Sequence, residues 1–431
     1  MAVIRLSGDE AKGIAEQFVR PLTERRPTCT PFVAGGEKVD EVVACYFKSP
    51  HSYTGDDTVE ISCHGSLYIQ QTILQYLVKA GARIAEPGEF TRRAFINGKL
   101  NLSQAEAVAD LVNSTTQASN QLALNQLRGT YQLKLKAMRQ ELLDLTALLE
   151  LELDFSQEDV QFADRSRLMA LAKNIEDDAI KLVESFRSGN AVKNGVKVAI
   201  IGAPNAGKST LLNTLLNDDR AIVSDIPGTT RDTIEDTAII DGILVRFIDT
   251  AGLRHSEDPI EQAGIERSLK AAREADIIIE VVDSTAVSEA TPIQLPESHA
   301  VTIEALNKCD LFTDSGSRPP EADRHARKGI SQTIEISAKE GTGLDTLKQA
   351  IVAPFKERGD GAMLSNLRHY EAMKHLLEAI RQVIRGLEDE VATDLVAIDL
   401  RDAIYHIGSI TGEVTTDEIL GNIFSKFCVG K

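Results

Sequence analysis

The sequence lacks the features of an extracellular or membrane-spanning protein. Its five cysteines are odd in number, scattered and without the spacing of metal ligands, which is typical of a reducing compartment. The longest apolar runs are roughly half of what a transmembrane helix needs. The first residues have no basic start, long apolar core or cleavage site of the kind that a secretory signal requires. We therefore expect a cytoplasmic protein with no membrane partner.

An excess of positive charge is also missing. The chain has 65 acidic and 47 basic side chains and a formal net charge of −18. This balance argues against non-specific binding to nucleic acid or membranes, although it does not exclude a local basic site. Hydrophobic residues make up 42% and charged residues 26%, which is ordinary for globular proteins. A chain of 431 residues is then expected to form roughly two to four domains.

The pattern along the chain predicts a multidomain α/β protein with four segments. They are a small α/β domain over residues 1–98, a helical segment over 99–195, an α/β domain over 196–355 and a second helical segment over 356–431. Neither helical segment looks self-sufficient. The simplest interpretation is one helical bundle domain with the α/β domain inserted into it, because the two ends of such a domain commonly lie close together.

Local patterns make these segments more specific. In the first segment we expect one helix, over residues 67–79, and a loop over residues 85–90. Ser103 and Glu106 are placed to form a capping box that starts the first helical segment. Apolar residues recur at steps of three and four on two expected helices, at Leu135, Met138, Leu142, Leu145 and Leu149 and at Met373, Leu376, Leu377, Ile380, Val383, Ile384 and Leu387.

Continuous apolar strands separated by helices predict a mostly parallel sheet in residues 196–355. After the strand over residues 196–201 comes Gly-Ala-Pro-Asn-Ala-Gly-Lys-Ser, residues 202–209, which fits the P-loop pattern and opens a helix. In a P-loop the backbone N–H groups surround a phosphate. Lys208 would contact the β- and γ-phosphates, and Ser209 would bind Mg²⁺. An accidental glycine-rich turn is the weaker alternative.

Three further motifs follow in the order found in GTPases. Asp249-Thr250-Ala251-Gly252 comes after an apolar strand, so that Asp249 can hold a Mg²⁺ water and Gly252 can sense the γ-phosphate. Asn307-Lys308-Cys309-Asp310 ends another strand, and Asp310 can accept two hydrogen bonds that guanine offers and adenine does not. Ser337-Ala338-Lys339 can supply a backbone contact to the guanine oxygen. The expected nucleotide is therefore GTP or GDP, which disfavours an ATPase.

The loop over residues 224–232 has the composition of a nucleotide-dependent switch, and Thr230 is the expected second Mg²⁺ ligand. Ras-like enzymes place a water-orienting glutamine directly after D-x-x-G, but this chain has Leu253. Another polar group must orient the water. Chemistry alone does not rank the acidic candidates downstream, which are Glu257, Asp258, Glu261 and Glu266.

At these residues the chain resembles the tRNA-modification GTPase family called MnmE or TrmE, over nearly its whole length. The resemblance rests on the P-loop and on the sequences at residues 228–232, 249–254 and 264–267. Outside the GTPase motifs it extends to residues 87–95, 98–100 and 427–431, where Val429 replaces the usual isoleucine. The family usually has about twenty further residues before the segment that matches Val3-Ile4-Arg5. In the family these residues include a strand. Where that strand is lost, we expect one edge of the N-terminal sheet to be unpaired.

The resemblance implies a K⁺-dependent GTPase that is activated when two G domains dimerise. The matching K⁺ ligands are Asn205, Ser224, Ile226 and Thr229, and the water-orienting residue is Glu261. Arg231, in the same loop, is a further candidate for stabilising charge. Together the predicted nucleotide-binding residues are Asn205, Ala206, Gly207, Lys208, Ser209, Thr210, Ser224, Thr229, Thr230, Asp249, Gly252, Asn307, Lys308, Asp310, Ser337, Ala338 and Lys339.

The resemblance also implies that the N-terminal domain dimerises and binds 5-formyl-tetrahydrofolate or a related folate as a one-carbon donor. The matching residues are Arg5, Glu60, Lys99 and Lys431, and Cys428 is a candidate nucleophile for the one-carbon chemistry. With the flavoprotein MnmG (also called GidA), in a heterotetramer, the family adds an aminomethyl or carboxymethylaminomethyl group to C5 of the wobble uridine in tRNA. The alternative function is a regulatory GTP switch in ribosome assembly.

Overall fold

The computed structural model describes residues 1–154, 165–219, 236–248, 270–285, 300–311, 330–356 and 363–425, together with Phe427 and Gly430. Its contacts divide the chain into two compact units. The first unit is residues 1–112, 124–177 and 372–431, and the second is residues 113–123 and 178–371. The boundaries of the four predicted segments stay a prediction. No helix in the described part of the chain is both long and apolar enough to cross a membrane.

The first unit begins with an antiparallel sheet in the order β1-β4-β3-β2. Its strands are β1 (Ala2–Ser7), β2 (Thr28–Ala34), β3 (Glu37–Phe47) and β4 (Thr58–Cys63), and its helices are α1 (Ala11–Ala15), α2 (Leu67–Lys79) and α3 (Glu89–Ile96). Alternate strand residues such as Ile4 and Ile61 pack against Ile73 and Leu77 of α2. The opposite face of β1 carries Arg5, which is therefore left beside the sheet rather than in this core.

The expected helix over residues 67–79 is confirmed, and residues 85–88 of the expected loop lie outside any helix or named strand. The last two residues of that range instead begin α3, and the expectation of a single helix was wrong. Helix α1 has only five residues and is too short to show a periodic pattern. Helix α3 begins at Glu89, directly after Pro87-Gly88, where the turn residues masked its start. Gly88 needs its positive φ of 70°, and a Cβ there would lie 2.7 Å from the carbonyl oxygen of Phe424.

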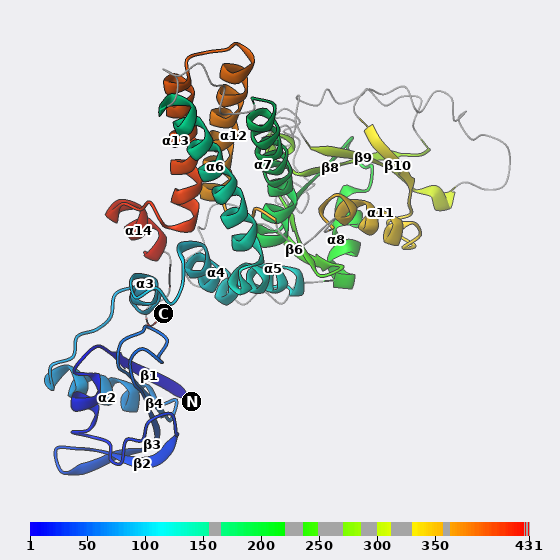
Figure 1. Cartoon of the computed structure of the whole chain (residues 1–431). Helices are drawn as coiled ribbons and strands as arrows, with labels where there is room; N and C mark the ends of the chain where they lie inside the picture. The colour runs from blue at the N-terminus through cyan, green and yellow to red at the C-terminus, as the bar shows by residue number, and fades with distance from the viewer. Residues whose placement is uncertain are drawn as a thin grey trace. The chain divides into compact units, whose positions relative to one another are not determined.

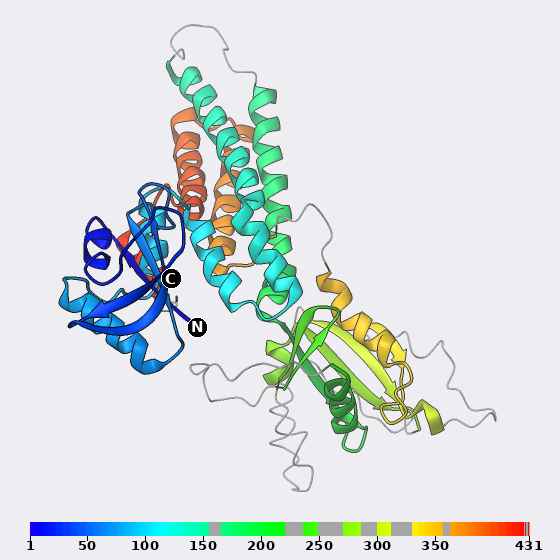
Figure 2. The same cartoon turned by 90° about the horizontal axis from the view of Figure 1, so that it is seen from below.

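Further helices, most of them longer, follow in the described part of the chain. They are α4 (Leu102–Asn113), α5 (Gln117–Arg128), α6 (Thr130–Asp154), α7 (Arg165–Asn194), α12 (Leu367–Glu388), α13 (Thr393–Thr411) and α14 (Asp417–Phe424). Figure 1 shows α6, α12 and α13 side by side, and Figure 2 shows the same arrangement from below. The two predicted apolar stripes on α6 and α12 are confirmed, because every member is buried. Within the first unit, Arg381 of α12 also pairs with Glu176 of α7 at 2.8 Å.

The capping box predicted at Ser103 and Glu106 was wrong by two residues. Helix α4 begins at Leu102, so Asn101 is the residue that precedes it. The Oδ1 atom of Asn101 accepts from the backbone N–H of Gln104 at 2.8 Å, and the Oε1 atom of Gln104 accepts from the N–H of Asn101 at 3.1 Å. These reciprocal bonds make Asn101 and Gln104 the capping box.

The second unit contains a six-stranded sheet in the order β10-β9-β8-β5-β7-β6. The strands are β5 (Val196–Gly202), β6 (Asp236–Ile240), β7 (Ile243–Phe247), β8 (Ile277–Asp283), β9 (Val301–Asn307) and β10 (Ile330–Glu335). All neighbours are parallel except β6 and β7. The predicted mostly parallel sheet is confirmed. Its parallel strands bring the carboxyl ends of β5, β8 and β9 to the same edge.

Among the residues that the structure describes, two helices pack on one face of this sheet. Helices α8 (Lys208–Asp219) and α11 (Leu344–Val352) contribute residues such as Leu211 and Leu347 to a core that also includes Val198, Ile279 and Ile303. The short 3-10 helices are η1 (Cys309–Leu311) and η3 (Ala353–Phe355). This packing holds the start of α8 at the end of β5, which is the place where a phosphate-binding turn is needed.

Candidate functional site

The predicted P-loop connects β5 to α8, as its pattern requires. Gly202 and Gly207 have positive φ values of 146° and 96°, and Asn205, a residue that tolerates the left-handed region, has a φ of 61°. A Cβ on Gly202 would lie 2.2 Å from the carbonyl oxygen of Val281 in β8. A Cβ on Gly207 would lie 2.1 Å from the Nδ2 atom of Asn307. Glycine is therefore required at both positions, and the loop backbone curls in front of the N-terminus of α8.

Lys208, the first residue of α8, folds back over this loop. Its Nζ atom donates to the carbonyl oxygens of Gly202 at 2.9 Å and Ala203 at 2.8 Å. Burial lowers the pKa of the Lys208 ammonium below its ordinary value. Neutral carbonyls compensate a partly buried ammonium poorly, whereas a phosphate forms shorter and stronger charge-assisted hydrogen bonds. A phosphate at this point would therefore be a stronger partner for the Lys208 ammonium than the two carbonyl oxygens are.

Asn307 joins three of the predicted motifs. Its Nδ2 atom donates to the carbonyl oxygen of Ala206 in the P-loop at 2.9 Å. Its Oδ1 atom accepts from the backbone N–H of Ala338 at 2.9 Å. The Ala338 carbonyl in turn accepts from Thr214 of α8 at 2.9 Å. Asn307 is 3% exposed, so these bonds lie in a buried environment and fix the phosphate side of the site to the expected base side.

The expected base-binding residues lie on two adjacent turns. The Asp310 carboxylate, in η1, is exposed. Ser337 is buried, and its backbone N–H donates to the carbonyl oxygen of Thr342 at 2.9 Å. Lys339 is exposed and its ammonium lies 3.2 Å from the carboxylate of Glu340. The predicted residues Ser209 and Thr210 lie in the first turn of α8, and Thr210 is exposed.

Asp283, an acidic residue at this edge of the sheet, was not among the predicted site residues. Asp283 is the last residue of β8, and its Oδ2 atom lies 2.6 Å from the Nζ atom of Lys308. The signal was present, since an acidic residue that ends a mostly apolar strand in a P-loop domain lies at the ligand-binding edge. No sequence motif includes Asp283, because its partner Lys308 follows the neighbouring strand, β9, 25 residues farther along the chain.

Several predicted site residues lie outside the described part of the chain. They are Ser224, Ile226, Thr229, Thr230, Arg231, Asp249, Gly252, Glu261, Cys428 and Lys431. Their roles stay predictions.

In the N-terminal sheet, two of the predicted folate-binding residues contact each other. Arg5 of β1 lies opposite Glu60 of β4, and a guanidinium nitrogen of Arg5 lies 2.7 Å from the Glu60 carboxylate. The Arg5 guanidinium also lies 5.3 Å from the ring centre of Tyr53 and 5.5 Å from that of Phe90. Lys99 follows α3, and its Nζ atom donates to the carbonyl oxygen of Pro50, in the loop that carries Tyr53, at 2.9 Å.

A cavity of about 780 Å³ runs along β1. Arg5 and Phe90 line it, together with Arg83, Glu89 and Gly430. Glu60 and Lys99 are not among its lining residues. The cavity has the size of a small-molecule site and combines aromatic, apolar and charged groups. A small molecule bound there would lie beside the Arg5 guanidinium.

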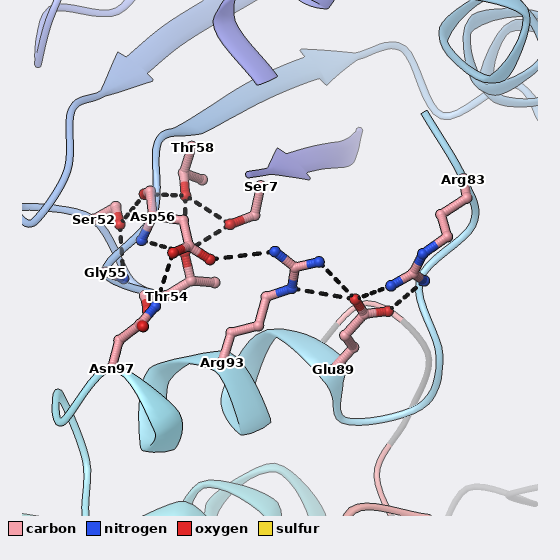
Figure 3. Close-up of polar contacts among 10 residues, drawn as sticks. All are labelled: Ser7, Ser52, Thr54, Gly55, Asp56, Thr58, Arg83, Glu89, Arg93 and Asn97. Atoms are coloured by element: carbon pink, nitrogen blue, oxygen red, sulfur yellow. Dashed lines mark hydrogen bonds and ion pairs between the residues drawn. The ribbon is translucent and has the colours of Figure 1, made fainter. Parts of the chain in front are cut away.

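A network of ion pairs holds the wall of this cavity (Figure 3). The Glu89 carboxylate accepts from Arg83 at 2.5 Å and 2.8 Å and from Arg93 at 3.0 Å. Arg93 also reaches Asp56 at 3.3 Å, and Asn97 donates to the same carboxylate at 2.9 Å. Helix α3 is thereby tied to the loop that carries Tyr53.

Hydrogen bonds from Arg83, the largest contribution, lower the pKa of Glu89 from 4.5 to about 2. A carboxylate with a depressed pKa in the folded state adds stability above its unfolded pKa, and this stability is lost as the pH falls through the folded value. We expect Glu89→Gln to destabilise the domain by about 2 kcal/mol near pH 7. The difference from the unsubstituted protein should shrink as the pH falls from 4.5 towards 2 in thermal unfolding. The control is Glu41→Gln, which removes the carboxylate of an exposed pair with Lys38. A pH-independent effect of Glu89→Gln would contradict the prediction.

Two family models together match nearly the whole chain. The model of the TrmE N-terminus, described as a GTP-binding protein, matches residues 1–99, and the model of the MnmE helical domain matches residues 102–428. The tRNA modification GTPase MnmE of Parabacteroides distasonis is 49% identical, over 100% of this chain and 97% of that relative. The same-named protein of Bacteroides fragilis is 48% identical, over 99% and 96%. Among solved structures, the G domain of the T. maritima FeoB iron transporter is 24% identical, covers 37% of this chain and 97% of that chain, and has a TM-score of 0.25.

Proposed function

Because the chain belongs to the MnmE (TrmE) family of tRNA modification GTPases and is therefore a GTP-hydrolysing enzyme, we propose that it uses GTP to drive the modification of C5 of the wobble uridine in tRNA. The product would carry an aminomethyl or carboxymethylaminomethyl group. The observation that carries the GTP part of the proposal is the junction at Asn307, which joins the P-loop to both turns expected to bind guanine. The tRNA part is carried by membership of the family.

The residues of this junction divide the work on the nucleotide. The N–H groups of residues 205–210 would bind the phosphates, and Lys208 would turn from its two carbonyl partners to the β- and γ-phosphates. Asp310 would accept hydrogen bonds from guanine, and the Ala338 region would contact the guanine oxygen. Ser209 and Thr230 would hold Mg²⁺, which supplies positive charge to the phosphates when bound.

Hydrolysis needs a group that orients water and a charge beside the phosphate that is transferred. Leu253 is apolar at the position where Ras-like enzymes have glutamine, so we assign the first role to Glu261, which matches the water-orienting glutamate of the family. Asn205, Ser224, Ile226 and Thr229 would hold K⁺, whose positive charge stabilises the transition state. Arg231 would add to this stabilisation. Dimerisation of two G domains would complete the site.

The proposed folate chemistry is supported by one of its predicted residues, Arg5, which lines the N-terminal cavity. Arg5 would pair with an anionic group of the cofactor, Glu60 would accept N–H groups of a pterin, and Lys99 and Lys431 would bind its remaining charge. Cys428 is the candidate nucleophile for one-carbon transfer. We further propose that the protein works in the cytoplasm as a homodimer, in a heterotetramer with the flavoprotein MnmG. Since this chain has a net charge of −18, that partner would supply much of the surface that binds tRNA.

The test is steady-state GTP hydrolysis in KCl and in NaCl at equal ionic strength. We expect clear stimulation by K⁺, and we expect Glu261→Ala to keep GTP affinity while lowering kcat by about a hundredfold or more. Asp345→Ala is the control, because Asp345 is exposed in the first turn of α11 and lies outside the nucleotide motifs. Equal slow rates in both salts would favour the alternative, a regulatory switch in ribosome assembly.

A further inference from the structure

Asp283 lies at the junction between β8 and β9 and is held there from both sides. It pairs in register with Asn307 across the parallel strands. Its Oδ1 atom accepts from the backbone N–H of Thr285 at 2.9 Å and from the Thr285 hydroxyl at 2.6 Å. Its Oδ2 atom is then directed to the Nζ atom of Lys308, at 2.6 Å. The two bonds from Thr285 thus orient the Asp283 carboxylate toward the Lys308 ammonium.

Lys308 occupies a backbone conformation that is unfavourable for a lysine. Its φ is 67°, in the left-handed region, and such a conformation persists only where surrounding contacts enforce it. The next residue, Cys309, donates its N–H to the carbonyl oxygen of Ile336 at 3.2 Å. The ion pair with Asp283 holds the other side of the turn. Asp310 follows immediately, so its carboxylate is carried by a turn that depends on these contacts.

The charges in this turn are only partly exposed. The side chain of Lys308 is 32% exposed and that of Asp283 is 21% exposed. At this depth a short ion pair is less screened than one on the open surface, and it also restricts the flexible lysine stem. Removing the carboxylate charge would release the Lys308 stem and weaken the turn, without replacing any residue that is predicted to contact the nucleotide.

We propose that Asp283 is a positioning residue for guanine recognition, because it holds Lys308 and thereby the turn that presents Asp310. The inference rests on the proposed role of Asp310 as the acceptor of guanine N–H groups. Hypoxanthine, the base of inosine nucleotides, lacks the exocyclic amine and can give Asp310 only one of the two hydrogen bonds. The ratio of GDP affinity to IDP affinity therefore reports how well Asp310 is placed.

The experiment measures GDP and IDP binding by titration calorimetry in the full chain and in Asp283→Asn. The substitution keeps the shape and the acceptor for Thr285 but removes the charge. We expect GDP affinity to fall about tenfold and the GDP-to-IDP ratio to fall about fivefold. Asp241→Asn is the matched control, since the Asp241 carboxylate also pairs with a lysine, Lys356 at 3.0 Å, but lies outside the nucleotide motifs. It should bind both nucleotides as the unsubstituted protein does.

Two results would overturn the proposal. One is an unchanged GDP-to-IDP ratio in Asp283→Asn, whether both affinities fall together or neither changes, because a merely structural role predicts no change in selectivity. The other is an unsubstituted protein that binds GDP and IDP equally and an Asp310→Asn variant that behaves likewise. That second result would also remove the proposed base-reading role of Asp310, so the two failures are distinguishable.

Discussion

Replacement of Lys208 by alanine should abolish GTP hydrolysis and lower GTP affinity by at least about a hundredfold. The ammonium already lies within the phosphate-binding loop, where it makes hydrogen bonds of 2.9 Å and 2.8 Å to two carbonyl oxygens. A triphosphate would exchange these neutral acceptors for charged ones. Without Lys208, the backbone N–H groups would remain, but the strongest single cationic contact within the described loop would be gone.

Binding of a fluorescent GTP analogue and single-turnover hydrolysis would measure the two effects. Lys356→Ala is the control, because Lys356 also pairs with acidic and polar groups in the second unit but lies outside the nucleotide motifs. Thermal unfolding would show that both variants are folded. Retained nucleotide affinity in Lys208→Ala would mean that the P-loop is not the phosphate-binding site.

A second large effect is expected for Gly207→Ala. The new Cβ would lie 2.1 Å from the Nδ2 atom of Asn307, and alanine would have to adopt a φ of 96°. The clash cannot be relieved without moving the amide that bridges Ala206 and Ala338. We therefore expect nucleotide affinity to fall by about two orders of magnitude and the melting temperature of the second unit to drop by several degrees.

Gly242→Ala separates the backbone effect from the clash. Gly242 has a similar φ of 78°, but a Cβ there would meet nothing within 4 Å. It should therefore show only the cost of the unfavourable conformation, about 1 kcal/mol, with nucleotide binding preserved. Calorimetry of nucleotide binding and thermal unfolding would measure both variants. If the two substitutions had equal effects, the junction at Asn307 would not be the reason for the glycine at position 207.

Much of the fold followed from repeated patterns. The apolar stripes of α6 and α12 were visible because a helix places every third or fourth residue on one face, and the strands of the parallel sheet were visible as short apolar runs. Elements without such a pattern were missed or misplaced. Helix α3 followed a Pro-Gly turn, and the capping box of α4 began at Asn101 rather than Ser103 because the helix begins one residue before the serine.

The kind of chemistry could be predicted from local sequence, because the P-loop and the motif at residues 307–310 are each a short run with particular side chains at fixed spacing. The tertiary structure alone decided which of these groups act together. Asn307 reaches Ala206 across 101 residues, Ala338 across 31, and Lys308 reaches Asp283 across 25. Such pairs depend on the order and register of parallel strands. That arrangement is set by packing across the whole sheet, which no local spacing encodes.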